Sequence, residues 1–443
     1  MKTDILIAGC GCSGLYCALN LPKDRQIVII TKSDMESSDS FLAQGGMCML
    51  TKEEDYDSYF EDTLKAGHYE NDRKSVEIMI RSSRDVVDDL ISLGADFQRE
   101  ADGSLAYTRE GAHSANRIIF HKDVTGKEIT SHLLEKVKQL SNVTIMEYTT
   151  LMDIISKDNI CYGAVLKLKD GRLKKIQAKQ VVLATGGVGG VYRHSTNFRH
   201  LTGDAIAIAV RHGVLLKDID YVQIHPTTLY VDKPTDRSFL ISESVRGEGA
   251  KLYDKNGNRF VNELLPRDLL TNEIKKQMEK DGTNFVWEDL RPIKKEELLS
   301  HFPNIVQHCK EHGYDVFNEC IPVVPAQHYF MGGIKVNYES KTSMENLYAV
   351  GETACNGVHG RNRLASNSLL ESLVFAKRAA LDIAQNKAAD KILNTQTQNA
   401  EKNGLDNKNI DCIVKDWSLE SYKDLEALQS SYKEIVKEKL NYT

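Results

Sequence analysis

The feature that most constrains the fold is a glycine-rich turn near the start of the chain. The apolar run 4–8 precedes Gly9, Gly11 and Gly14, and a second apolar run, 26–30, follows a helical pattern. This order predicts a strand, a tight turn, a helix and a second strand within about 30 residues. In that context G-x-G-x-x-G lets backbone N–H groups at the helix start bind a pyrophosphate. The sequence therefore predicts a dinucleotide-binding unit, and the motif alone leaves the dinucleotide open.

The turn after the second strand departs from the pattern of NAD-binding proteins. Thr31, Lys32 and Ser33 stand where an acidic residue is expected, and Asp34 and Glu36 come only later. An acid at that place typically accepts hydrogen bonds from the ribose of NAD. The departure argues against NAD.

Two further apolar runs end abruptly in glycine. Residues 180–184 lead into Gly186 and Gly187, and residues 346–350 lead into Gly351. Buried strands of this kind are typical of a parallel sheet that presents its carboxyl ends to a ligand. We therefore expect both runs to join the sheet begun by the first two strands.

Two helices are predicted from spacing and end signals. Residues 75–93 have the apolar periodicity of one helix, and Gly94 follows where a C-terminal cap is expected. Ser368 and Glu371 have the spacing of a capping box, which predicts the start of another helix.

Composition and patterning divide the 443 residues into a nucleotide-binding fold and an insertion. We expect an α/β protein whose Rossmann-like domain has two parts, 1–218 and 330–385. Residues 219–329 mix short strands and helices and are expected to form an inserted α+β capping domain. Residues 386–443 are polar and then weakly amphipathic, which predicts a short helical C-terminal region.

Charge and cysteine usage exclude several classes of partner. There are 57 Lys and Arg against 63 Asp and Glu, a net charge of −6, and neither sign forms long blocks. Nucleic acid and anionic membrane are therefore not expected partners, and we expect neither a signal peptide nor a membrane span. The nine cysteines form no paired metal-binding spacing, so we expect no metal, free thiols and a cytoplasmic location. A small molecule is the expected partner.

Seven motifs that follow in one order carry a resemblance to a known family. They are Ala43–Gly46, Thr108–Ser114, His225–Thr227, Ser242–Gly249, Pro266–Asp268, His328–Tyr329 and His359–Leu369. With them the chain resembles, from Asp4 to about Gln385, the flavoprotein family of fumarate reductase and succinate dehydrogenase. Within that family it is most similar to the aspartate oxidases.

The resemblance implies FAD as the cofactor. The residues expected to contact FAD are Gly9, Cys10, Gly11, Cys12, Ser13, Gly14, Lys32, Asp39, Ser40, Phe41, Leu42, Ala43, Gln44, Gly45, Gly46, Asp204, Glu352, Ser368 and Leu369. Glu352 is expected to bind the adenosine-ribose hydroxyls. Asp39 lies where relatives in membrane complexes carry a histidine bonded covalently to FAD, and an aspartate forms no histidyl bond. FAD is therefore expected to bind noncovalently.

The resemblance also implies a dicarboxylate substrate, which needs donors at both ends because a buried unpaired carboxylate is costly. By the family pattern, His225, Ser242 and His328 bind one carboxylate. Arg363 binds the other and fixes the substrate against the flavin.

The catalytic set implied by the resemblance is His225, His328, Arg267 and Glu243. Arg267 stands where a proton must move, and pure charge stabilisation is its rival role because the pKa of arginine exceeds about 12. Glu243, in preference to Glu248, is expected to form an ion pair or a proton relay with Arg267.

Glu110 is the residue that distinguishes substrates. L-aspartate has an ammonium group that succinate lacks, and the glutamate of the T-R-E-G-x-H-S motif is expected to bind it. The resemblance thus implies hydride transfer from Cα of L-aspartate to flavin N5, which gives iminoaspartate, with fumarate or oxygen as electron acceptor. The resemblance further implies that this reaction is the first step of NAD biosynthesis through quinolinate, with transient contact with quinolinate synthase as the associated partner expectation.

Two alternatives stay open. One is a soluble fumarate reductase, or the flavoprotein subunit of a succinate dehydrogenase-type membrane complex, which Asp39 and Glu110 oppose. The other is a nucleotide-binding module without catalysis, which the retention of Arg267, Arg363, His225 and His328 opposes.

Overall fold

The main sheet of the computed structural model has seven strands in the order β5-β2-β1-β8-β7-β6, and β15 also pairs with β8. The structure describes residues 1–232, 237–385, 410–422 and 424–440. The strands are β1 (Lys2–Ala8), β2 (Ile27–Ile30), β5 (Val143–Met146), β6 (Thr150–Lys157), β7 (Ile160–Lys167), β8 (Leu173–Leu183) and β15 (Leu347–Ala349).

The predicted parallel sheet is confirmed. β1 pairs in parallel with β2 and β8, and β15 pairs in parallel with β8. The sheet is extended by an antiparallel flank, β8-β7-β6, that the sequence patterns did not predict.

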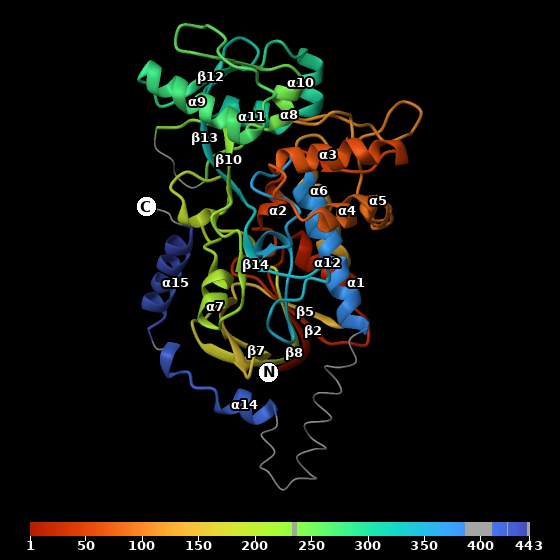
Figure 1. Ribbon diagram of the computed structural model, residues 1–443, viewed down its shortest axis with the longest axis vertical. Helices are drawn as coiled ribbons and strands as arrows, with labels where there is room; N and C mark the ends of the chain where they lie inside the picture. The colour runs from red at the N-terminus through yellow and green to blue at the C-terminus, as the bar shows by residue number, and fades with distance from the viewer. Residues whose placement is uncertain (233–236, 386–409, 423, 441–443) are drawn as a thin grey trace.

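Alternate residues of β1 face opposite sides of the sheet, and helices cover both sides (Figure 1). Ile5 and Ile7 pack with α1 (Cys12–Asn20), α6 (Thr125–Lys138) and α12 (Asn367–Gln385). Leu6 and Ala8 pack with α7 (Asp204–Arg211) and α15 (Leu425–Lys439). The sheet is therefore buried on both faces, as expected of parallel strands.

The glycine turn between β1 and α1 is as tight as the motif predicts. Gly9 has a φ of +123°, and a Cβ added there would lie 1.9 Å from the carbonyl oxygen of Ala184. A Cβ added at Gly14 would lie 2.2 Å from the carbonyl oxygen of Gly9. Only glycine lets the strand, the turn and the helix approach so closely.

Two helix predictions need correction. Residues 75–93 form two helices, α4 (Arg73–Arg81) and α5 (Ser83–Ser92), separated at Ser82. The apolar residues of both helices pack into one core, so the predicted apolar face is kept across the break. The predicted C-terminal cap is confirmed, since Gly94 follows α5 with a φ of +106°. The predicted capping box at Ser368 is wrong, because α12 already starts at Asn367 and Glu371 accepts instead from Asn356 Nδ2.

A separate antiparallel sheet holds the residues between the two parts of the main fold, at the top of Figure 1. Its order is β10-β13-β12-β11. We call this sheet and its four helices the four-stranded unit; its elements are β10 (Val222–Leu229), α8 (Glu243–Gly247), β11 (Lys251–Tyr253), α9 (Arg267–Asp281), β12 (Val286–Asp289), α10 (Lys295–His301), α11 (Pro303–Glu311) and β13 (Ile321–Phe330). Its buried side chains, from Leu229 to Val323, form a hydrophobic cluster of their own. The exact domain boundaries stay a prediction.

Polar contacts join the four-stranded unit to the main fold. The carboxylate of Asp123 accepts hydrogen bonds from Asn304 Nδ2 at 2.7 Å and from Ile305 N at 2.9 Å. On another side, His68 Nε2 lies 2.9 Å from the carboxylate of Asp268.

The remaining elements are the helix α3, several short elements and part of the C-terminal region. They are α2 (Asp39–Leu42), β3 (Met47–Cys48), η1 (Glu53–Asp55), α3 (Tyr56–Ala66), β4 (Ile118–Ile119), η2 (Gly189–Val191), β9 (Leu216–Lys217), β14 (Gly333–Lys335), η3 (Gly351–Thr353), β16 (Ala354–Cys355), α14 (Ile410–Asp416) and η4 (Glu420–Tyr422). Residues 386–409 of the expected C-terminal region lie outside the described residues. Within the described part of the chain, none of the helices combines the length and apolar character needed to cross a membrane.

Glu288, in β12, is a fully buried carboxylate with no hydrogen-bond partner within residues 1–232, 237–385, 410–422 and 424–440. Burial raises the pKa of Glu288 to about 7. Because this folded-state pKa lies above the unfolded value, the free energy of unfolding falls as the pH rises from 4.5 to about 7. Between about pH 5 and about pH 8, the parent protein is expected to lose on the order of 3 kcal/mol of unfolding free energy that Glu288→Gln does not lose. Urea denaturation of both proteins at the two pH values measures this, and an equal pH dependence would contradict it.

Candidate functional site

One cleft runs from the carboxyl ends of β1 and β8 to the inner surface of the four-stranded unit. Every residue predicted to bind substrate or to act in catalysis lines it, namely Glu110, His225, Ser242, Glu243, Arg267, His328 and Arg363. The main fold contributes Glu110 and Arg363, and the four-stranded unit contributes the rest.

Nearly all residues predicted to bind the cofactor line the same cleft. The exceptions are Gly14 and Phe41. Gly14 permits the close contact of α1 with Gly9, and Phe41 packs against the hydrophobic core behind the cleft. Both residues lie behind the walls of the cleft, and their contact with the cofactor stays a prediction.

The cleft fits a large polar cofactor at its main-fold end. At Gly46 an added Cβ would lie 2.2 Å from Ile118 Cγ2, so only glycine fits there, and the turn 43–46 lines the cleft. The buried atoms Ser38 Oγ, Asp39 Oδ2 and Gln44 Oε1 line this end and have no hydrogen-bond partner within the described ranges. Buried polar atoms are rarely left unpaired, so these donors and acceptors suit a bound polar molecule.

Charged residues at this end are partly paired already. Lys32 Nζ lies 2.6 Å from Asp204 Oδ2, and the same ammonium donates to Thr202 Oγ1 and His200 O. Burial raises the pKa values of both Asp39 and Glu352, and each carboxylate accepts one backbone hydrogen bond. Asp39 lies at the start of α2, on the wall of the cleft, as predicted.

His225 and His328 stand side by side at the other end, with ring centroids 5.1 Å apart. Burial, reinforced by Arg267, holds the pKa values of both histidines well below their ordinary value, so both are neutral at pH 7. His225 Nδ1 lies 3.0 Å from the carbonyl oxygen and 3.2 Å from the backbone nitrogen of Thr227, so Thr227 anchors this edge of the ring. His225 Nε2 has no hydrogen-bond partner among the described residues, and His225 lines the cleft, so this nitrogen is available to a ligand.

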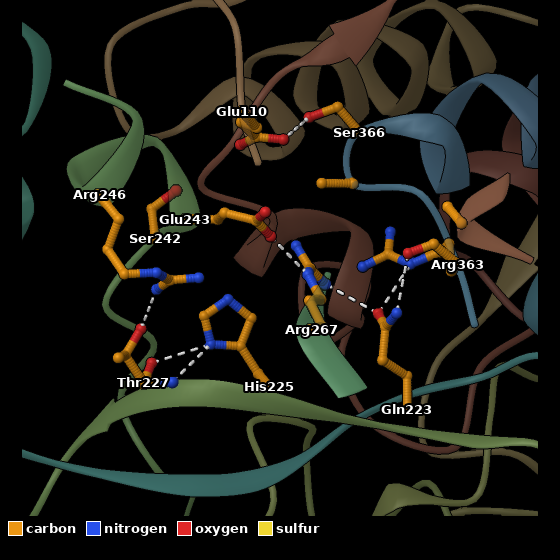
Figure 2. A network of polar contacts seen from close by, with 12 residues as sticks. Glu110, Gln223, His225, Thr227, Ser242, Glu243, Arg246, Arg267, Arg363 and Ser366 are labelled. Carbon is orange, nitrogen blue, oxygen red and sulfur yellow. Dashed lines mark hydrogen bonds and ion pairs between the residues drawn. The ribbon is translucent and has the colours of Figure 1, made fainter. Parts of the chain in front are cut away.

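Arg267 and Glu243 form a buried ion pair (Figure 2). Arg267 Nε lies 2.6 Å from Glu243 Oε2, and both side chains are less than a tenth exposed. Burial alone would raise the pKa of Glu243, but Arg267 and Arg246 outweigh it and hold that pKa below its ordinary value. Glu243 is therefore an ionised partner that orients the guanidinium. Glu248, the rejected candidate, pairs with His301 and does not line the cleft.

Gln223 is a site residue that the sequence patterns missed. Its Oε1 accepts from Arg267 Nη1 at 2.8 Å and from Arg363 Nε at 3.3 Å, so one oxygen joins the two arginines (Figure 2). Gln223 lies two residues before His225 in β10, and alternate residues of a strand share a face. That spacing is the sequence signal that could have found it.

Arg363 lies between the two ends of the cleft. Its guanidinium stands 4.4 Å from the ring centre of Tyr329 and donates to Ser368 Oγ. Burial, together with Arg267, lowers the pKa of Arg363 to about 10, so it stays charged at neutral pH. Tyr329 and Thr196 also line the cleft and were missed; Thr196 Oγ1 lies 2.7 Å from His328 Nδ1.

Glu110 is a buried carboxylate that faces the cleft without a cationic partner among the described ion pairs. Its two oxygens accept from Ser244 Oγ at 2.7 Å and from Ser366 Oγ at 2.6 Å. Burial and the nearby Glu243 raise the pKa of Glu110. A cation brought into the cleft would satisfy this charge, as a bound ammonium group would.

Proteins similar to this chain are named L-aspartate oxidases. An L-aspartate oxidase of Clostridium perfringens is 52% identical over 380 residues, which cover 86% of this chain and 86% of that protein. An L-aspartate oxidase of Bacillus subtilis is 40% identical over 393 residues, which cover 87% of this chain and 72% of that protein.

Solved structures agree with this relationship. An E. coli quinol fumarate reductase FrdA chain is 30% identical with a TM-score of 0.82, covering 91% of this chain and 74% of that one. Mycobacterium smegmatis Sdh1 is 28% identical with a TM-score of 0.74, covering 90% and 72%. The family described as FAD binding domain matches residues 4–369. This chain belongs to that family of flavoproteins, and FAD is the cofactor for which its cleft is built.

Proposed function

We propose that this protein oxidises L-aspartate to iminoaspartate, with fumarate or oxygen as the final electron acceptor. The observation that carries the proposal is Glu110, a buried carboxylate without a cationic partner in the described residues, at the edge of a cleft that otherwise presents donors for carboxylates. Substrates without an amino group leave this charge unpaired. L-aspartate pairs it.

In this proposal, neutral donors and cations share the two carboxylates. His225 Nε2, His328 and the Ser242 hydroxyl bind one of them. Arg363 binds the other through a charged guanidinium whose position is set by Gln223 and Ser368. FAD, when bound, accepts the hydride that leaves the substrate Cα.

Arg267 either transfers the proton that the reaction moves or stabilises the charge that develops in the transition state. Its guanidinium is fixed by Glu243 on one side and Gln223 on the other, so its free edge faces the cleft with little freedom to turn. A preorganised charge of this kind stabilises a transition state without reorganising at the moment of reaction.

Two finer parts belong to the same proposal. Iminoaspartate hydrolyses readily, so transfer to quinolinate synthase on the path to NAD suits its chemistry. All nine cysteines are free thiols, which suits the reducing cytoplasm.

An anaerobic experiment tests the proposal. We expect L-aspartate to bleach the flavin absorbance of the purified yellow protein, and succinate to bleach it scarcely, because only L-aspartate pairs Glu110. Bleaching by succinate alone would move the protein to the fumarate reductase alternative. A purified protein without flavin would leave only a module without catalysis.

A further inference from the structure

We infer that Arg117 is a positioning residue that makes the protein selective for dicarboxylates bearing an amino group, by fixing the loop 110–114. The inference rests on the proposed function. It follows from three sets of contacts. The first holds Arg117, the second joins Arg117 to the loop, and the third joins the loop to the segment 365–366, which holds the Glu110 carboxylate.

The first set holds Arg117, whose side chain has no exposed surface. Its guanidinium donates from Nη2 to Asp55 Oδ1 at 2.9 Å, from Nη1 to Asp62 Oδ2 at 2.6 Å, and from Nη2 to Ser58 Oγ at 2.8 Å. Asp55 and Asp62 belong to η1 and α3. Two carboxylates and a tyrosine ring, that of Tyr59 at 5.1 Å, therefore fix the plane of this buried cation.

The second set joins Arg117 to the loop. Asp62 Oδ2 also accepts from Ser114 N at 2.8 Å and from Ser114 Oγ at 2.7 Å. Arg117 Nη1 donates to His113 Nδ1 at 3.2 Å. Burial, reinforced by Arg117, lowers the pKa of His113 to about 4, so the ring is neutral and accepts at Nδ1.

The protonated nitrogen of His113 then points to the floor of the cleft. With Nδ1 accepting, Nε2 carries the hydrogen and donates to Ala365 O at 3.1 Å. The next residue, Ser366, donates its hydroxyl to Glu110 Oε2 at 2.6 Å and accepts from Gly46 N at 3.2 Å. The loop is thus tied at His113 to the same segment that holds the Glu110 carboxylate.

The conformation of the loop is strained. Ala112 has a φ of +64°, in the left-handed region that a residue with a Cβ rarely adopts. Such a conformation persists where surrounding contacts over-determine it. The contacts of His113 and Ser114 with Arg117 and Asp62 are those contacts.

Selectivity follows because the predicted carboxylate donors do not belong to this loop. The predicted carboxylate donors His225, Ser242, His328 and Arg363 come from other segments. The loop reaches Ser242 indirectly, because the Ser244 hydroxyl that donates to Glu110 accepts from Ser242 Oγ. A displaced loop is therefore expected to move the predicted ammonium partner more than the predicted carboxylate partners. A displacement of about 1 Å at a reacting centre is sufficient to cost about 100-fold in rate.

The test compares two substrates in Arg117→Gln and Arg117→Lys. We expect kcat/KM for anaerobic L-aspartate oxidation to fall about 100-fold, mainly through KM, while fumarate reduction by the reduced flavin falls less than about 3-fold. Lysine keeps the charge but lacks the planar fork that meets Asp55, Asp62 and His113 together, so it is not expected to restore activity with L-aspartate.

Arg211→Gln is the matched control. Arg211 also contacts a buried aspartate, Asp153 at 3.3 Å, and lies 5.5 Å from the ring of Tyr432, but these partners lie outside the loop 110–114. If a substitution acts only by lowering stability, it lowers both activities and the FAD content together, and Arg211→Gln shows the size of that effect. Equal losses with both substrates in the Arg117 variants would overturn the inference.

A second variant keeps the test decisive where Arg117→Gln does not fold. Asp62→Asn retains the shape of the side chain but removes the charge that meets Arg117 and Ser114, and the same selective loss is expected. Unchanged selectivity in a folded Asp62→Asn would overturn the inference. Failure of the parent protein to oxidise L-aspartate would instead refute the proposed function, so the two failures are distinguishable.

Discussion

Arg267→Gln is expected to lower kcat for L-aspartate oxidation about 1000-fold while the protein still binds FAD. Arg267 lines the substrate end of the cleft, and its guanidinium is held by Glu243 and Gln223. Glutamine removes the cation and leaves the Glu243 carboxylate buried without its partner. Single-turnover flavin bleaching under anaerobic conditions measures the loss at the chemical step.

A second substitution separates charge from geometry. Arg267→Lys keeps a positive charge but cannot meet Glu243 and Gln223 with one planar group. If it retains more than about a tenth of the parent kcat, positive charge is sufficient and the oriented guanidinium is not required. Arg259, a half-exposed arginine that pairs with Glu263 outside the cleft, gives the control variant Arg259→Gln.

Glu110→Gln is expected to lower kcat/KM for L-aspartate about 100-fold and fumarate reduction far less. Glutamine fits the same space between Ser244 and Ser366, but it offers no charge to an ammonium group. Steady-state rates with both substrates measure the difference. Equal losses in the two activities would remove Glu110 from the role of ammonium partner.

The pH dependence of the same residue has a definite sign. Burial raises the pKa of Glu110 above its ordinary value of 4.5, so this carboxylate takes up a proton at a higher pH than an exposed glutamate does. A protonated Glu110 cannot pair an ammonium group. We expect kcat/KM for L-aspartate to decline in acid with a break above pH 4.5, and this break to be absent in Glu110→Gln.

The parts of the molecule that sequence predicts well are those set by local backbone chemistry. Gly9 and Gly14 marked the turn because no other residue fits between β1, α1 and Ala184. The apolar runs that end in glycine became parallel strands of one sheet. Each of these features depends on a few adjacent residues, so its signal lies within one short stretch of sequence.

Features that depend on distant partners could not be predicted in the same way. Gln223 binds two arginines that lie 44 and 140 positions further along the chain; its spacing from His225 places it on the same face of β10 but does not indicate these partners. Ser368 has the spacing of a capping box, yet its hydroxyl serves Arg363. The break at Ser82 likewise depends on packing, because the apolar periodicity of residues 75–93 is the same for one helix as for two.

The separate hydrophobic core of the four-stranded unit bears on how easily the cleft opens. The cluster from Leu229 to Val323 shares no side chain with the clusters on either face of the main sheet. Contacts such as Asp123 with the start of α11 and His68 with Asp268 are polar, and water replaces polar contacts at modest cost. A small rotation of the unit about the ends of β10 and β13, where Phe330 packs into the main-sheet cluster, would therefore exchange such hydrogen bonds for hydration while the cluster from Leu229 to Val323 stays dry.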